Sequence, residues 1–300
     1  MAAPQTPPDL PGFLLYKDVE DLEHGLPIVA SYYRHPDTGI IIQHPIPEPE
    51  QLRSLYPTEY RPHANHGLVH HLKLLQARIL LRKLASVLPA KDGAILDMGC
   101  GGGHLLIQLR TQGFMNLTAM DWGENLRPTM EDHGISFVSS DIESDAVLPS
   151  SYDLIILNNV IEHLSDPGKA IARLKPNLKP RGRILLITPN ERSLSHRLFG
   201  RHWAGLHAPR HLHVFNPDTL TQLAGAQGYS ADCQLLPDPS CWAISIQNII
   251  RVSRRPSPPY TSTAWYTLAL MPCCIVPAII EHVLSRSSSM LAILHPEKAG

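Results

Sequence analysis

The sequence predicts an α/β fold in which a mostly parallel, doubly wound sheet carries helices on both faces. Glycines at 99, 101 and 103 follow a short apolar run and precede a helical pattern, and a second apolar run ends in an acid, Asp121. Strand and helix patterns then alternate from Ile95 to Ile187, as right-handed crossovers require. The 300 residues, 43% of them hydrophobic, suffice for one large domain and a small appendage.

Composition narrows the class of protein. The formal net charge is −1, so no basic excess favours nucleic acid as a partner. The five cysteines show no C-x-x-C spacing and no secretory signal precedes them, which predicts reduced thiols and a cytoplasmic location.

The first 65 residues of the chain are predicted to stand apart from the large domain. Residues 1–12 are proline-rich without periodicity and are expected to form a disordered tail. Residues 13–65 are expected to form a small N-terminal unit, in which 30–34 and 40–43 pair as a hairpin and 48–56 form a short helix.

The large domain is predicted to span 66–300 and to begin with a helix over 66–88. Its apolar residues recur at helical spacing, which predicts one buried face. The residues of that face are Leu68, Leu72, Leu75, Ile79, Leu80 and Leu84.

The glycine turn after Asp97 is the first candidate ligand site. Glycine permits positive φ and close approach of a ligand, and the following helix offers unpaired N–H groups. The third glycine of a dinucleotide-binding motif is replaced by His104, which disfavours NAD. Asp121 lies 24 positions beyond Asp97, where an acid typically binds ribose hydroxyls.

Several segments, in order, resemble motifs of the class I S-adenosylmethionine-dependent methyltransferases. They are DMGCGGG at 97–103, Asp121, Asp141-Ile142, YDLIIL at 152–157, IEHLSDP at 161–167 and LKPRGRIL at 178–185. The resemblance implies a Rossmann-like, seven-stranded sheet, whose last, antiparallel strand would lie at 289–294, and it implies S-adenosylmethionine as cofactor.

The resemblance also implies roles for the cofactor-binding residues. Asp97 would favour the cationic end of the methionine portion, and Gly99, Cys100, Gly101 and Gly103 would admit it. Asp121 and the adjacent Trp122 would lie at the ribose, Asp141 and Ile142 at the adenine, and Asn158 at the same open end of the sheet. For Asp141 a role as a helix cap is the alternative.

Candidate catalytic residues follow the fourth strand and lie in a loop rich in His and Arg at 197–215. A neutral histidine suits removal of a proton from a hydroxyl acceptor. His163 is the first candidate base and His211 the second, while Arg210 could hold the substrate. The alternatives are that His163 fixes the turn at Asp166 and that Arg210 pairs with an acid of its own loop.

No metal is predicted. A related subset of methyltransferases carries a zinc ribbon in the N-terminal unit, but here His35 and Thr38 replace the cysteines, which suggests a decayed ribbon. The chain also partly resembles ubiquinone-pathway O-methyltransferases, whose E-x-x-E-H segment can hold a divalent ion. Asn159 replaces the first carboxylate of that segment, which weakens a site for a hard cation.

A hydrophobic helical insertion is predicted at about 242–289, and three interpretations of its apolar run at 264–284 stay open. It could form a lid over the acceptor, a homodimer surface, or a peripheral membrane contact. Pro272, Pro277 and Glu281 argue against a membrane-spanning helix.

The predicted function is methyl transfer to a small-molecule or lipid-like acceptor, at oxygen. The alternatives are C- or N-methylation of a natural-product or sugar intermediate, and a non-catalytic scaffold that retains the fold.

Overall fold

The computed structural model describes residues 12–55, 67–144, 148, 151–254 and 264–297. The predicted tail at 1–12 lies almost wholly outside the described residues.

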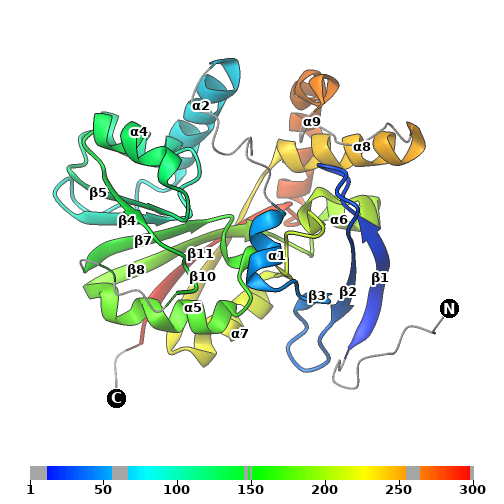
Figure 1. Ribbon diagram of the computed structural model, residues 1–300, viewed down its shortest axis with the longest axis horizontal. Helices are drawn as coiled ribbons and strands as arrows, with labels where there is room; N and C mark the ends of the chain where they lie inside the picture. Colours follow the sequence, from blue (N-terminus) through cyan, green and yellow to red (C-terminus); the bar gives the residue numbers. More distant parts are fainter. Residues whose placement is uncertain (1–11, 56–66, 145–147, 149–150, 255–263, 298–300) are drawn as a thin grey trace.

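The centre of the molecule is a seven-stranded sheet in the order β10-β11-β8-β7-β4-β5-β6 (Figure 1). Pairing is parallel from β8 through β6, whereas β11 is antiparallel to both β8 and β10. The last, antiparallel strand expected near 289–294 is β11. The strands are β4 (Ala94–Met98), β5 (Asn116–Asp121), β6 (Ser136–Ser139), β7 (Tyr152–Asn158), β8 (Leu178–Pro189), β10 (Tyr229–Leu236) and β11 (Ser289–Pro296).

Helices cover both faces of this sheet, so each strand alternates its side chains between two apolar cores. On one face Leu96 and Ile155 pack with α5 and α7; on the other Ile95 and Leu154 pack with α2, α3 and α4. The helices are α2 (Gly67–Lys83), α3 (His104–Thr111), α4 (Arg127–Asp132), α5 (Pro167–Leu174) and α7 (Pro217–Ala226). The predicted α/β fold class is confirmed.

A second, four-stranded sheet has the order β1-β2-β3-β9, from β1 (Phe13–Glu20), β2 (Val29–Arg34), β3 (Ile41–His44) and β9 (His213–Val214). The β2–β3 hairpin was predicted, and α1 (Pro49–Ser54) lies within the predicted short helix, but β1 and β9 were not foreseen. Tyr32 and Ile41 share a core with Trp203 and Leu206. The N-terminal strands are therefore packed by residues about 170 positions away, and the boundary at 65 stays a prediction.

The predicted buried face of the helix at 66–88 is wrong in part. Leu72, Leu75 and Ile79 are exposed, whereas Ala77 and Leu81 are buried against the sheet. Periodicity predicts which residues share a helix face, but not which face is buried. In α2 the face that packs against α3 contains the small residue Ala77, and bulkier apolar side chains are exposed to solvent.

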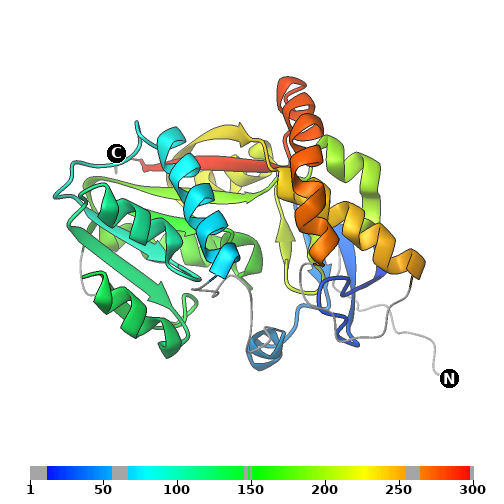
Figure 2. The same ribbon diagram turned by 90° about the horizontal axis from the view of Figure 1, so that it is seen from above.

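The segment between β10 and β11 folds into two packed helices, α8 (Pro239–Arg254) and α9 (Trp265–Val283). Pro272 and Pro277 lie inside α9, which continues through both. Seen from above, α9 and the shorter α6 (Leu194–Phe199) flank α8 at the edge away from β6 (Figure 2).

Candidate active site

The glycine turn after β4 has a backbone that few other residues could adopt. Gly99, Gly101 and Gly103 have φ of 67°, 54° and 68°. A Cβ on Gly99 would lie 2.7 Å from Val160 Cγ2, so the segment that follows β7 rests directly on the turn. The N–H groups of Gly99 and Cys100 both donate to the carbonyl of Met120 at the end of β5. The turn is thus fixed by both neighbouring strands.

Asp97 carries the most perturbed carboxyl of this turn. It is 2% exposed, and its Oδ1 has no hydrogen-bond partner among the described residues. Burial, with a further contribution from the Asp121 carboxylate, raises its pKa to about 8. A buried acceptor without a donor costs free energy, so this carboxyl is suited to a cationic ligand.

Asp121 is held by backbone donors on both oxygens. Gly101 N–H donates to Oδ2 at 3.0 Å and Trp122 N–H to Oδ1 at 2.9 Å. Because each carboxylate oxygen can accept a second bond, both remain able to accept ribose hydroxyls. Trp122 is half exposed beside it and offers an aromatic surface.

The residues expected at the adenine lie in a turn after β6. Asp141 Oδ1 accepts from Glu143 N–H at 2.9 Å, and residues 142–144 form a turn, so within the described residues Asp141 does not cap a helix. Ile142 Cδ1 lies 3.5 Å from the position of a Cβ on Gly99, which brings it to the glycine turn. Asn158, at the end of β7, accepts from Asn159 Nδ2 at 3.2 Å.

These residues fit S-adenosylmethionine. The glycine turn leaves room for backbone approach, the buried Oδ1 of Asp97 suits an ammonium group, and Asp121 suits a diol. The individual contacts stay predictions.

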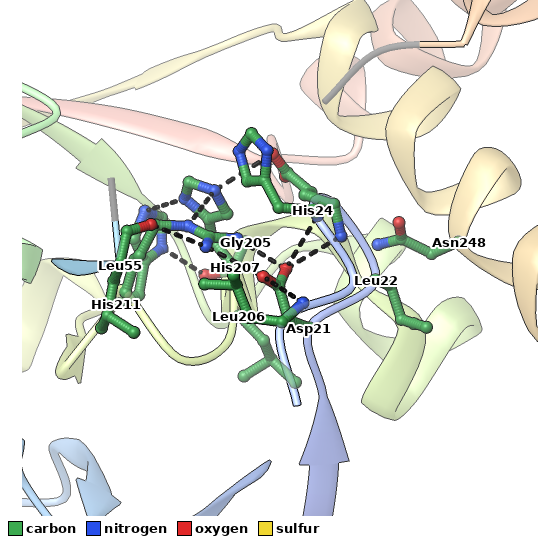
Figure 3. A network of polar contacts seen from close by, with 12 residues as sticks. Asp21, Leu22, His24, Leu55, Gly205, Leu206, His207, His211 and Asn248 are labelled. Carbon is green, nitrogen blue, oxygen red and sulfur yellow. Dashed lines mark hydrogen bonds and ion pairs between the residues drawn. The ribbon is translucent and has the colours of Figure 1, made fainter. Parts of the chain in front are cut away.

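Three histidines gather where the segment after β7 meets the loop before β9. The ring of His211 lies 4.6 Å from that of His163 and 4.8 Å from that of His207, each edge to face. His163 Nδ1 contacts the carbonyl of Arg210 at 3.0 Å and His211 Nδ1 that of Gly205 at 2.8 Å. Since a carbonyl only accepts, both rings carry their proton on Nδ1. Figure 3 shows His207 and His211 side by side near Gly205.

The three histidines are neutral because protein surrounds them: His211 is buried, and His163 and His207 are largely covered. Burial lowers the pKa of His163 to about 4, and it lowers the pKa of His207 and His211 well below the usual value. Neutral imidazoles can accept protons at physiological pH.

The role of Arg210 as a substrate clamp is wrong, and so is its pairing with an acid of its own loop. Its side chain is 0% exposed and forms two bonds to Asp21, at 2.7 and 3.1 Å, from the loop after β1. Burial alone would raise the pKa of Asp21, but Arg210 and the backbone N–H groups of His24 and Glu23 together lower it. Arg210 Nε also donates to His207 Nε2 at 2.9 Å, so the pair positions the histidines.

Two glutamates at the histidines were not foreseen. Glu162 is 0% exposed and accepts from Thr188 Oγ1 at 2.9 Å, and burial raises its pKa to about 8. Its Oε1 lies 3.9 Å from His211 Nε2. Glu23 Oε2 lies 3.1 Å from His207 Nε2, and burial raises its pKa as well. Glu162 lies within the quoted motif, but nothing in the sequence near Glu23 indicates a site.

One nitrogen from each of His163, His207 and His211 lies within 4.8 Å of the others, so these residues could hold a metal ion. The set does not fit the hard divalent ion of the E-x-x-E-H segment, which needs several oxygen ligands. The predicted absence of a required metal stays a prediction.

The fold and the glycine turn define an α/β protein with a site suited to an adenosyl cofactor. A family model described as a methyltransferase domain matches residues 68–234, more than half of the chain. The chain belongs to this family, and it is a class I S-adenosylmethionine-dependent methyltransferase, as the sequence predicted. The cofactor is S-adenosylmethionine.

Named relatives are more distant. A ubiquinone biosynthesis O-methyltransferase of Rickettsia akari is 29% identical over 44% of this chain and 55% of its own length. That of Coxiella burnetii is 26% identical over 50% and 69%. The chain thus spans about half the length of the first relatives. A structure from Galdieria sulphuraria, provisionally assigned as a sarcosine dimethylglycine methyltransferase, shares the fold, with a TM-score of 0.52 and 15% identity over 76% of this chain and 88% of its own.

Proposed function

We propose that this enzyme methylates a hydroxyl oxygen of a small or lipid-like acceptor, with His163 as the general base. The observation that carries the proposal is the neutral, oriented imidazole of His163 three residues beyond Val160, which itself rests on the glycine turn. The names of the matched relatives, which are O-methyltransferases, support oxygen as the target.

For this reaction the protein must align the acceptor hydroxyl with the methyl group and remove the hydroxyl proton. The bound cofactor supplies a methyl group on a positively charged sulfur, which leaves as a neutral thioether once the acceptor oxygen bonds to the methyl carbon. The chain must hold the hydroxyl in line with that bond, an effect worth about 7–11 kcal/mol. His163 accepts the hydroxyl proton on Nε2, because its Nδ1 is engaged by the Arg210 carbonyl.

Residues around His163 hold it in this state. Arg210 fixes Nδ1 through its carbonyl and is itself fixed by Asp21. His211 packs edge to face against the ring and restricts its rotation.

The test is methyl transfer from labelled S-adenosylmethionine to phenols and catechols, with amines of similar shape as comparison. We expect transfer to the hydroxyl compounds. His163→Ala should lower kcat by at least about a hundredfold while leaving affinity for S-adenosylhomocysteine unchanged. His133→Ala, at an exposed histidine that follows α4, is the matched control.

The pH profile tests where the base loses its activity. The folded pKa of His163 is about 4, so the active, unprotonated form persists as pH falls through 6.5 and is lost only near 4. We expect no acid limb near the ordinary value of histidine. Methylation of amines alone, with full activity in His163→Ala, would favour N-methylation, and cofactor binding without transfer to any acceptor would favour the scaffold.

A further inference from the structure

Helix α9 directs its polar contacts inward and its hydrocarbon outward. Thr267 donates to Gln247 of α8 at 2.6 Å, and the fully buried Glu281 accepts from Trp242 Nε1 at 2.5 Å and Ser288 Oγ at 2.6 Å. The exposed hydrophobic side chains of α9, hereafter the apolar strip, are Leu268, Ile275, Val276, Ile279, Ile280 and Val283. Water is a poor surrounding for such a face.

The strip belongs to the one described helix that is long and apolar enough to cross a membrane. Only 22% of its apolar segment, Tyr266–Val283, is buried. Thr267 and Glu281 bind α9 to α8 near both of its ends. The strip ends at Val283, and the chain enters β11 six residues later at Ser289. Crossing a bilayer would break these bonds, so α9 is suited to lie at its interface.

A cationic pocket adjoins the C-terminal end of the strip. It has a volume of about 440 Å³, and Arg192, Arg197, Arg286 and Leu284 are among its lining residues; we call it the arginine pocket. Arg192 pairs with Asp218. Arg197 and Arg286 are exposed and form no ion pair within the described part of the chain.

The acidic residue that lines the pocket, Glu191, does not neutralise its arginines. Glu191 is engaged by two bonds from Arg34, at 3.1 and 3.2 Å. Leu284 is exposed and lines the pocket while following Val283 of the strip, so the apolar and cationic surfaces are continuous.

We propose that the apolar strip and the arginine pocket form one docking surface for an anionic bilayer, with the strip among the acyl chains and lipid phosphate at Arg197 and Arg286. Charge complementarity favours this occupant over a second copy of the chain, whose described surface would have to supply an acid for each arginine. A guanidinium binds phosphate through paired donors.

The position of helix α2 supports an orientation of the molecule with α9 toward the bilayer. Helices α2 and α9 both project from the upper edge of the molecule in Figure 1, and both lie toward the viewer in Figure 2. Leu72, Leu75 and Ile79 of α2 are exposed. Two helices that carry exposed apolar side chains thus lie along one edge of the molecule, which fits a planar partner.

The experiment is co-sedimentation of the full chain with vesicles of phosphatidylcholine, alone or mixed with phosphatidylglycerol. We expect at least about tenfold stronger binding to the anionic vesicles, weakened by salt. Val276→Asp/Ile279→Asp and Arg197→Glu/Arg286→Glu should each lower that binding about tenfold. Met115→Asp, an exposed apolar residue before β5, should change nothing. Unchanged affinity for S-adenosylhomocysteine verifies that each variant is folded.

Three outcomes would overturn the proposal. One is absence of binding to the anionic vesicles. A second is a dimer in lipid-free solution that Val276→Asp/Ile279→Asp dissociates, which would assign the strip to a second copy. The third is loss of methyl transfer to a soluble acceptor in that variant while vesicle binding persists, which would make α9 a lid. None of these depends on whether oxygen is the atom methylated.

Discussion

The affinity for the cofactor should depend steeply on pH because Asp97 is buried. Its pKa of about 8 means that most molecules carry a protonated carboxyl at neutral pH. The ammonium group of S-adenosylhomocysteine favours the ionised form, so binding must expel a proton. Affinity should therefore rise with pH about tenfold per unit below 8 and level off above it.

The magnitude follows from the fraction ionised. Between pH 6 and pH 8 the ionised fraction of a group with a pKa of about 8 rises about fiftyfold, which corresponds to about 2 kcal/mol of binding free energy. At pH 7 binding should release about 0.9 protons.

Calorimetric titration with S-adenosylhomocysteine in two buffers of different ionisation enthalpy measures both quantities. Asp97→Asn should bind weakly and without the pH slope. Asp121→Asn should move the midpoint to lower pH, because the Asp121 carboxylate helps to raise the pKa of Asp97. A flat profile in the native chain, together with unchanged affinity in Asp97→Asn, would refute the assignment of Asp97 to the ammonium group.

Two further predictions concern the backbone and the buried ion pair. Gly99→Ala places a side chain at a φ of 67° and against Val160, and it should weaken cofactor binding by about 1–3 kcal/mol. Gly113→Ala, at a φ of 89° in open space, should leave cofactor binding unchanged. Equal effects of the two substitutions on the calorimetric affinity would contradict a close approach of the cofactor to the turn. Arg210→Met should lower the free energy of unfolding by about 3–5 kcal/mol, because it strands the buried Asp21 carboxylate, and Asp21→Asn/Arg210→Met should recover part of the loss. Both variants are measured by urea titration. Arg192→Met removes an exposed ion pair and should lower the free energy of unfolding by less than about 1 kcal/mol. Similar losses at both arginines would contradict the idea that burial makes the Arg210–Asp21 pair more important.

The sheet and the cofactor turn were predictable because their signals are local. Strand period, glycines with positive φ and the two acids at strand ends lie within short windows, and parallel pairing then brings Asp97 and Asp121 to one edge. The partner of Arg210 was not predictable. Asp21 is 189 positions away, and a buried guanidinium leaves no pattern in the sequence that distinguishes it from an exposed one.

The same limit explains the acceptor side. His163 was found from its motif, but its approach to His207 and His211 depends on how a loop without regular periodicity folds back. On α2 the spacing of leucines was recognised, yet the face that meets the sheet is chosen by packing against α3, which spacing alone does not encode.

The pairing of β3 with β9 has a consequence for synthesis of the chain. Ile42 pairs with His213, about 170 residues later, and Tyr32 donates to the carbonyl of Leu206 at 2.9 Å. At typical elongation rates the N-terminal strands leave the ribosome roughly ten to thirty seconds before their last partner strand. During that interval the edge of β3 and the apolar face of Tyr32 have no native cover from the loop, so chaperone binding to the nascent chain should concentrate on residues 29–44 and end once β9 has emerged.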